Sequence, residues 1–150
     1  DEIYELRAVL EEFAGRRVAQ MGAAGDLKSL RALVDRLDRA VARNDLDAYH
    51  KANLAFHDAL VALAGNGKLL ATYRRLVNEL NLYRRATLAR EGTLPMSVRE
   101  HHDILDKIAA GQSAAAGAAL HDHAMRSRER MHEVRAGAAA STVPRLRRKR

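Results

Sequence analysis

The stretch Leu46–Gly67, LDAYHKANLAFHDALVALAGNG, decides the fold of this chain. Its apolar periodicity predicts a helix from about Leu46 to Ala64. The helix should end at Gly65-Asn66-Gly67, because glycine and asparagine tolerate the left-handed backbone conformation. His57 lies on the apolar stripe of this helix, and Asn53 lies one turn earlier on the same face. The sequence therefore predicts a buried helix that carries two polar side chains inward.

Five further helices are expected around this stretch, from apolar periodicity and from turn residues. The expected segments are Glu2–Met21; from an N-cap at Asp26 to about Arg43; Lys68 to about Arg90; from a capping box at Ser97 and Glu100 to Gly111; and Gln112 to about Val134. The main apolar positions of the first are Ile3, Leu6, Leu10, Phe13, Val18 and Met21. Short connections between long amphipathic helices favour antiparallel neighbours. The predicted fold class is all-α, an antiparallel bundle of about six helices.

The composition is that of one helical domain. The chain has 150 residues, of which 47% are hydrophobic and only 4% aromatic. That length suffices for one sizeable core. The sequence has no cysteine, which excludes a disulfide framework, a zinc finger and a thiol nucleophile. Its longest uncharged stretch, Ile108–Leu120, is too short to cross a bilayer, so a cytoplasmic protein without membrane contact is expected.

The net charge of +7 arises mainly at the end of the chain. Five of the 26 basic residues lie in positions 145–150, and the remaining basic residues nearly balance the 19 acidic ones. We therefore expect a folded domain at residues 1–136 and a basic flexible tail at residues 137–150. A solvated tail is the favoured interpretation, and an accessory contact with phosphate is the alternative.

Three of the seven histidines are expected to face the interior. His57, His101 and His123 lie on the apolar stripes of three different predicted helices, whereas His102 is turned toward an edge. Together with Asn53, these three could meet and bind a divalent metal, because neutral imidazole is a good ligand for first-row divalent ions. The alternative is that each ring is a core group held by hydrogen bonds, which would require a partner for every ring nitrogen.

Three other polar residues are candidates for binding an anion beside such a metal. Arg7 and Arg84 fall on the apolar stripes of their helices, and Ser127 lies one turn after His123. Each arginine could instead pair with a carboxylate of a helix or extend to the surface, which is the more common outcome. Ser127 could instead bond back to the preceding turn of its own helix. If an arginine does line a site next to a metal, a carboxylate would bind both.

Four segments together resemble a known family. They are YELRAVLE at residues 4–11, ANLAFHDAL at 52–60 leading to AGN at 64–66, EHHDIL at 100–105 with IAAG at 108–111, and ALHDH at 119–123. In this order they resemble the FCD domain, the C-terminal ligand-binding domain of FadR-type GntR transcription regulators. The resemblance covers about Asp1 to Val134.

The resemblance implies a helical antiparallel bundle that binds a divalent metal and a small organic acid. By position, the metal ligands would be Asn53, His57, His101 and His123. The family usually has aspartate where this chain has Asn53, so the site would keep one more positive charge and attract an anionic effector more strongly. Zinc is the expected metal, and nickel, cobalt, manganese and iron also suit imidazole and amide ligands.

The family also implies partners. Its members join this domain to an N-terminal winged helix-turn-helix that binds operator DNA as a dimer. That segment is not among these 150 residues. We therefore expect a homodimer that contacts DNA only through such a missing N-terminal domain. The effector would act by binding more tightly to one relative position of the FCD domain and the DNA-binding domain than to another.

The leading hypothesis from the sequence is therefore an effector-sensing domain of a transcription regulator without catalytic activity. Its expected effector is a small carboxylate, bound by Arg7, Arg84 and Ser127 beside the metal. The alternative is a metal-dependent hydrolase or lyase on a helical bundle, since three histidines with an open coordination position could activate water. The inward stripes offer no obvious general base, because Asp58 and Asp103 should point away from the ligands.

Overall fold

The computed structural model of the chain describes residues 1–22, 27–88 and 93–141, without the side chains of residues 81–88, 93, 134, 135 and 137–141. The described residues form six α-helices and no strand. The helices are α1 (Glu2–Gln20), α2 (Leu27–Ala42), α3 (Leu46–Leu63), α4 (Gly67–Leu88), α5 (Thr93–Ala109) and α6 (Ser113–Ser141). The predicted all-α bundle is confirmed.

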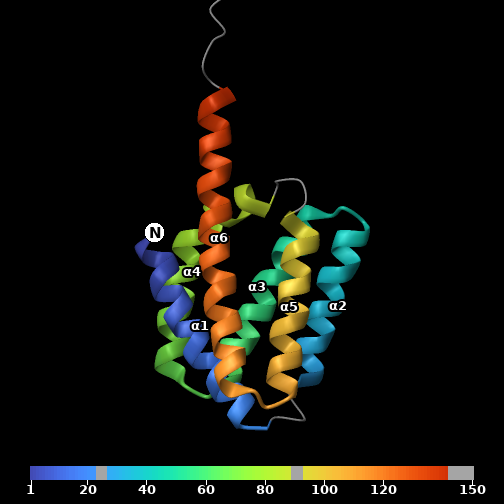
Figure 1. The fold of residues 1–150 in the computed structure, drawn as a ribbon, viewed down its shortest axis with the longest axis vertical. Helices are drawn as coiled ribbons and strands as arrows, with labels where there is room; N and C mark the ends of the chain where they lie inside the picture. Colours follow the sequence, from blue (N-terminus) through green and yellow to red (C-terminus); the bar gives the residue numbers. More distant parts are fainter. Residues whose placement is uncertain (23–26, 89–92, 142–150) are drawn as a thin grey trace, which may run out of the picture.

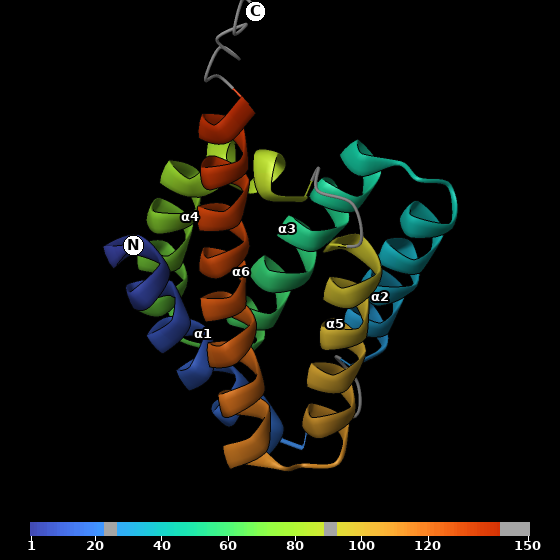
Figure 2. The same cartoon turned by 45° about the horizontal axis from the view of Figure 1, so that its top comes forward.

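Successive helices alternate in direction, so the bundle is antiparallel (Figures 1 and 2). α3 packs against α1, α2 and α4, and α6 packs along α1, with α5 on its other side. The main core joins Val18, Leu30, Phe56, Leu60, Tyr73, Ile104 and Leu120 from all six helices. α3 is therefore a central helix, and its buried polar residues Asn53 and His57 face the interior of the bundle.

Small residues allow α1 and α6 to approach each other closely. A Cβ atom on Gly15 would overlap the buried Leu120 side chain and lie 3.2 Å from the Ala116 carbonyl oxygen. Ala8 and Ala14 are fully buried on the same helix. A larger residue at Gly15 would not fit at this contact, because protein interiors are close-packed.

The inward face of α1 differs in part from its predicted apolar positions. Leu6 and Phe13 are 54% and 46% exposed, and Met21 is also exposed. The buried face instead carries Tyr4, Arg7, Ala8, Glu11, Ala14, Gly15, Val18 and Ala19. Arg7 and Glu11 can occupy this face because they neutralise each other in the interior, and Gly15 lies where α6 approaches too closely for a larger side chain.

The predicted ends of α3 are confirmed. The Asp45 side chain caps this helix by accepting a hydrogen bond from the Ala48 amide at 2.9 Å, and Asn44 before it has a φ of 51°. After α3, Gly65 has a φ of 66°, which glycine adopts without steric cost. The expected N-cap of α2 at Asp26 and the expected end of α4 at Arg90 lie outside the described residues.

The predicted capping box of α5 is wrong. The helix begins at Thr93, four residues before Ser97, and Pro95 lies in its first turn, where a missing N–H removes no helical hydrogen bond. Ser97 is buried, and Glu100 contacts α6 instead of the helix start. α6 also continues to Ser141, past the expected end at Val134. The division into a domain at 1–136 and a tail at 137–150 stays a prediction.

No helix in the described ranges has the length and apolar character that a membrane span requires.

Candidate metal centre

Three histidines from three helices meet inside the bundle. His57 on α3, His101 on α5 and His123 on α6 are all buried, and their ring centroids are 4.7 to 5.1 Å apart. One nitrogen from each ring lies within 4.8 Å of the others. The Nε2 atoms of His57 and His101 are 3.2 Å apart. That separation is close to the roughly 3.3 Å edge of a tetrahedron with zinc–nitrogen bonds of about 2.0–2.1 Å.

The Nδ1 atom of each ring faces an oxygen acceptor. His101 Nδ1 lies 2.6 Å from the Ser97 carbonyl oxygen, one turn earlier on α5. His123 Nδ1 lies 2.6 Å from Oε2 of Glu100. His57 Nδ1 lies 3.2 Å from Oε2 of Glu11, a short contact with poorer hydrogen-bond geometry. These partners favour a proton on every Nδ1, which is an assignment from the contacts.

With the protons placed in this way, the Nε2 lone pairs of His57 and His101 face each other. A neutral imidazole with its proton on Nδ1 can only accept at Nε2. The 3.2 Å contact between Nε2 of His57 and Nε2 of His101 then joins two acceptors. Two lone pairs at this distance repel each other, whereas a cation placed between the rings would attract both. Metal-bound histidines in proteins have the same feature, a carbonyl or carboxylate oxygen that holds the other ring N–H.

Burial keeps two of the rings neutral. Burial lowers the pKa of His57 from 6.5 to about 3, and the Glu11 carboxylate only partly offsets this. Burial likewise lowers the pKa of His123 to about 3, against the opposing effect of Glu100. A histidine must be neutral to bind a metal, so both rings are in the required form at neutral pH.

Arg7 and Glu11 form a fully buried ion pair beside His57. Arg7 Nε donates to Glu11 Oε1 at 2.7 Å, and both side chains are inaccessible to solvent. Burial raises the pKa of the Glu11 carboxyl, but Arg7 and His57 outweigh this and hold the pKa well below its usual value. Glu11 is therefore a carboxylate. The pair places one negative and one positive group next to the histidine cluster.

A second carboxylate, Glu100, connects His123 to two arginines. Its oxygens accept hydrogen bonds from His123 Nδ1, from Arg126 Nε at 2.7 Å and from Arg130 Nη1 at 3.3 Å. Burial raises the pKa of Glu100, but the hydrogen bond from His123 and the charges of Arg130 and Arg126 lower it to about 2. Glu100 is therefore ionised and fixes the His123 ring.

The other predicted site residues have different positions. Asn53 is buried one turn before His57 on α3, and its role as a ligand stays a prediction. Ser127 donates to the His123 carbonyl oxygen at 2.9 Å, the local bond considered as its alternative, and it accepts from Arg130 Nη2 at 3.0 Å. The side chain of Arg84 lies outside the described residues.

Neither inward carboxylate, Glu11 or Glu100, is among the site residues predicted from the sequence. Glu11 follows Arg7 by four residues, a spacing that places an acid and a base side by side on one helix face, and this signal was available. Glu100 was assigned to a helix cap, so its contact with α6 was not foreseen. The prediction that the inward stripes offer no obvious general base does not take these two carboxylates into account. The outward orientation of Asp58 and Asp103 is confirmed, because they pair at the surface with Arg74 and Lys107.

Comparison with known proteins agrees with the geometry. A family model described as FCD domain matches residues 2–126, most of the chain. The chain belongs to the FCD domain family. It is thus an effector-binding regulatory domain of the GntR type. A search of curated proteins gives no match.

The residues of this FCD domain fit a metal. The three imidazoles form a nitrogen donor set that suits zinc and neighbouring first-row ions, and burial keeps two of them, His57 and His123, neutral. Bound there, such an ion would supply a positive charge and an open position for an anionic ligand.

Proposed function

We propose that this FCD domain binds a divalent metal, with zinc the first choice, and a small carboxylate that together report an effector to a transcription regulator of the FadR subfamily. The observation that supports this most directly is that ring nitrogens of three histidines, from α3, α5 and α6, lie within 4.8 Å of one another. His57, His101 and His123 would hold the ion, with Asn53 as a fourth, neutral ligand. The protein's contribution is to orient the rings through Glu11, Ser97 and Glu100.

Arg7 supports a carboxylate as the second ligand. Its Nη1 atom is buried and has no hydrogen-bond partner among the described residues, and neither has the buried hydroxyl of Tyr4. Arg7 is also close enough to His57 and His123 to lower the pKa of both rings. A carboxylate at an open metal position would therefore find a guanidinium donor nearby, and such charge-assisted bonds are strong.

The position of Arg7 suggests how the effector would act. Arg7 and Glu11 both lie on α1, and the family resemblance places the DNA-binding half before this helix. An acid held between the metal and Arg7 would favour one position of α1 over others. It can shift the equilibrium only by as much as its affinity differs between those positions.

A homodimer is also part of the proposal. Leu6, Val9 and Phe13 form an exposed apolar stripe along α1. Glu2 and Glu5 lie at one end of that helix, and Arg16 and Arg17 lie at the other. Two copies of α1 packed antiparallel would bring Leu6 against Phe13 and acid ends against basic ends. Sedimentation equilibrium should show a dimer, and a monomer at all concentrations would contradict this part.

Catalysis is not part of the proposal. A metal-dependent hydrolase or lyase needs a general base that is free to take a proton. His123, Arg130 and Arg126 together keep the pKa of Glu100 at about 2, and Arg7 with His57 keeps that of Glu11 well below its usual value. Such weak bases do not suit proton abstraction at neutral pH.

The test is a thermal-shift screen of small carboxylic acids, with zinc and with chelator. An effector that binds the folded domain raises the Tm by mass action. We expect zinc to raise the Tm, and one or more acids to raise it further only when zinc is present. Arg7→Lys should remove the response to acid but keep the response to zinc, and Arg16→Lys, on the exposed side of α1, should keep both. If the acids raise the Tm equally with chelator and with zinc, the metal and the carboxylate do not share one site.

A further inference from the structure

A second site is formed by a groove between α2 and α3. Its volume is about 290 Å³, and it shares no residue with the histidine cluster. Its hollow shape has a simple cause, because four of the residues that line it are alanines, namely Ala40, Ala48, Ala52 and Ala55. Small side chains leave space between two packed helices that larger ones would fill.

Cations line both sides of this groove. Arg36 and Arg39 lie three residues apart on one face of α2, Arg43 follows the last residue of that helix, and Lys51 lies opposite on α3. All four are exposed, and none forms an ion pair with a carboxylate in the part of the chain that the structure describes. Unpaired cations in one concave site are a place where an anion would be stabilised.

One carboxylate also lines the groove. The Asp45 side chain is engaged at the start of α3, where Oδ1 accepts the amide proton of Ala48 at 2.9 Å. It reduces the positive charge of the groove but leaves the four cations in clear excess.

We propose that this groove binds a small molecule with at least two phosphoryl groups. The three arginines present planar donor forks, which bind phosphate oxygens two at a time, and Lys51 adds a fourth positive charge. An anion with three to four negative charges balances the excess of cations better than a dicarboxylate does. The alanines offer an apolar floor for the rest of such a molecule. This site is independent of the proposed metal centre.

The shape of the groove disfavours a nucleic acid duplex. The axes of two packed helices are about 8–10 Å apart. A DNA duplex is wider than this, because its major groove alone is about 12 Å wide, so it cannot enter the groove between α2 and α3. A duplex could touch the tips of the arginines but could not reach the alanine floor. A compact phosphorylated molecule can contact both walls and the floor.

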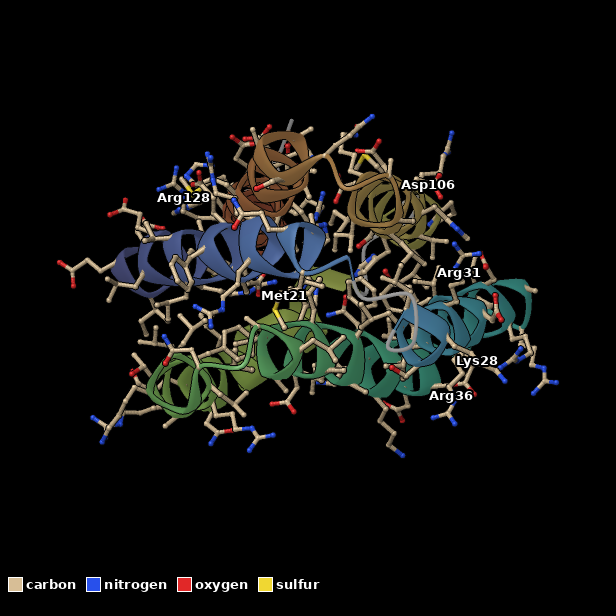
Figure 3. All side chains as sticks on the ribbon, turned by 90° about the horizontal axis from the view of Figure 1, so that it is seen from below. Met21, Lys28, Arg31, Arg36, Asp106 and Arg128 are labelled. Atoms are coloured by element: carbon tan, nitrogen blue, oxygen red, sulfur yellow. The ribbon has the colours of Figure 1, made fainter. Side chains whose placement is uncertain are left out.

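The same helix offers a matched control. Figure 3 shows Arg31 and Arg36 on opposite sides of α2, with Arg31 on the side toward α5. Arg31 is exposed and does not line the groove. Arg31→Gln therefore removes the same charge from the same helix as Arg39→Gln but leaves the groove intact.

The experiment is a calorimetric titration of the full 150-residue chain with inorganic pyrophosphate. Metal is first removed by dialysis against chelator, because pyrophosphate also binds metals, and the buffer contains about 0.15 M salt to screen exposed charges. We expect binding that Arg39→Gln and Arg43→Gln each weaken by about tenfold. Arg31→Gln should change the affinity less than twofold. The basic segment 145–150 is present in every variant, so it cannot account for such a difference.

Three results would overturn the proposal. The first is no binding at millimolar pyrophosphate, and the second is an equal loss in Arg31→Gln and Arg39→Gln. The third is binding of a DNA duplex that depends on Arg39 while pyrophosphate fails to bind. Because the titration contains no metal, none of these results bears on the histidine site.

Discussion

Replacement of Glu100 by glutamine tests how firmly the His123 ring is held. Glu100 is only 11% exposed and accepts hydrogen bonds from His123, Arg126 and Arg130. Glutamine keeps the shape and one acceptor but removes the charge. It leaves Arg130, which is 7% exposed, without a carboxylate partner among the described residues. The variant should therefore fold, but with lower stability and a looser His123.

The structure gives the size of the effect. A pKa lowered from 4.5 to about 2 corresponds to roughly 3 kcal/mol in favour of the charged form, and partial access of solvent reduces this to about 2–3 kcal/mol. Glu12→Gln is the matched control, because Glu12 pairs with Arg16 at the surface. Exposed pairs contribute about 0–1 kcal/mol. Zinc affinity should also fall by about 10–100-fold in Glu100→Gln, as for other groups that orient a ligand.

Urea denaturation at pH 7 in chelator measures the free energy of unfolding of both variants. Because the folded pKa of Glu100 is depressed, its contribution is present above pH 4.5 and is lost as the pH falls toward about 2. The gap between wild type and Glu100→Gln should therefore narrow over that range. A loss at pH 7 no larger than that of Glu12→Gln would refute the reasoning, and so would a gap that does not change with pH.

Two further predictions concern α3 and the contact of α1 with α6. Asn53→Asp should tighten zinc binding, because a carboxylate is a stronger ligand than an amide, and an unchanged or weaker affinity in a chelator competition would exclude Asn53 as a ligand. Gly15→Ala should lower the free energy of unfolding by about 1–3 kcal/mol, because the new methyl group overlaps Leu120 and outweighs the gain in helix propensity. Urea denaturation measures this loss, and a more stable variant would show that the two helices can move apart.

Much of the fold could be predicted from periodicity and turn chemistry. The ends of α3 were predictable, because Gly65 acts through its own backbone conformation and Asp45 through a side-chain hydrogen bond to an amide three residues later. The start of α5 was not, because Ser97 has the residue type of a cap while Pro95 fits equally well in a first turn. Local sequence does not decide between these alternatives, because the contact of Glu100 with His123 on α6 depends on how the helices pack.

The site shows the same division. His57, His101 and His123 were predictable because each lies on an apolar stripe, and three buried imidazoles need a common explanation. The acceptors that orient them were harder to foresee. Glu11 and Glu100 lie on helices other than those of the rings they contact, so their roles depend on how the helices pack. Sequence periodicity shows which face of a helix is buried, but it does not show which other helix packs against that face.

Zinc binding by His101→Ala, compared with His102→Ala, tests whether the histidine cluster holds a metal ion. The two residues are adjacent on α5, but His101 faces the cluster whereas His102 is exposed and pairs with Asp38. Titration against a chromophoric chelator measures the stoichiometry and the affinity. We expect one zinc ion per chain in wild type and in His102→Ala, with binding lost in His101→Ala. Equal zinc binding by both variants would contradict this expectation.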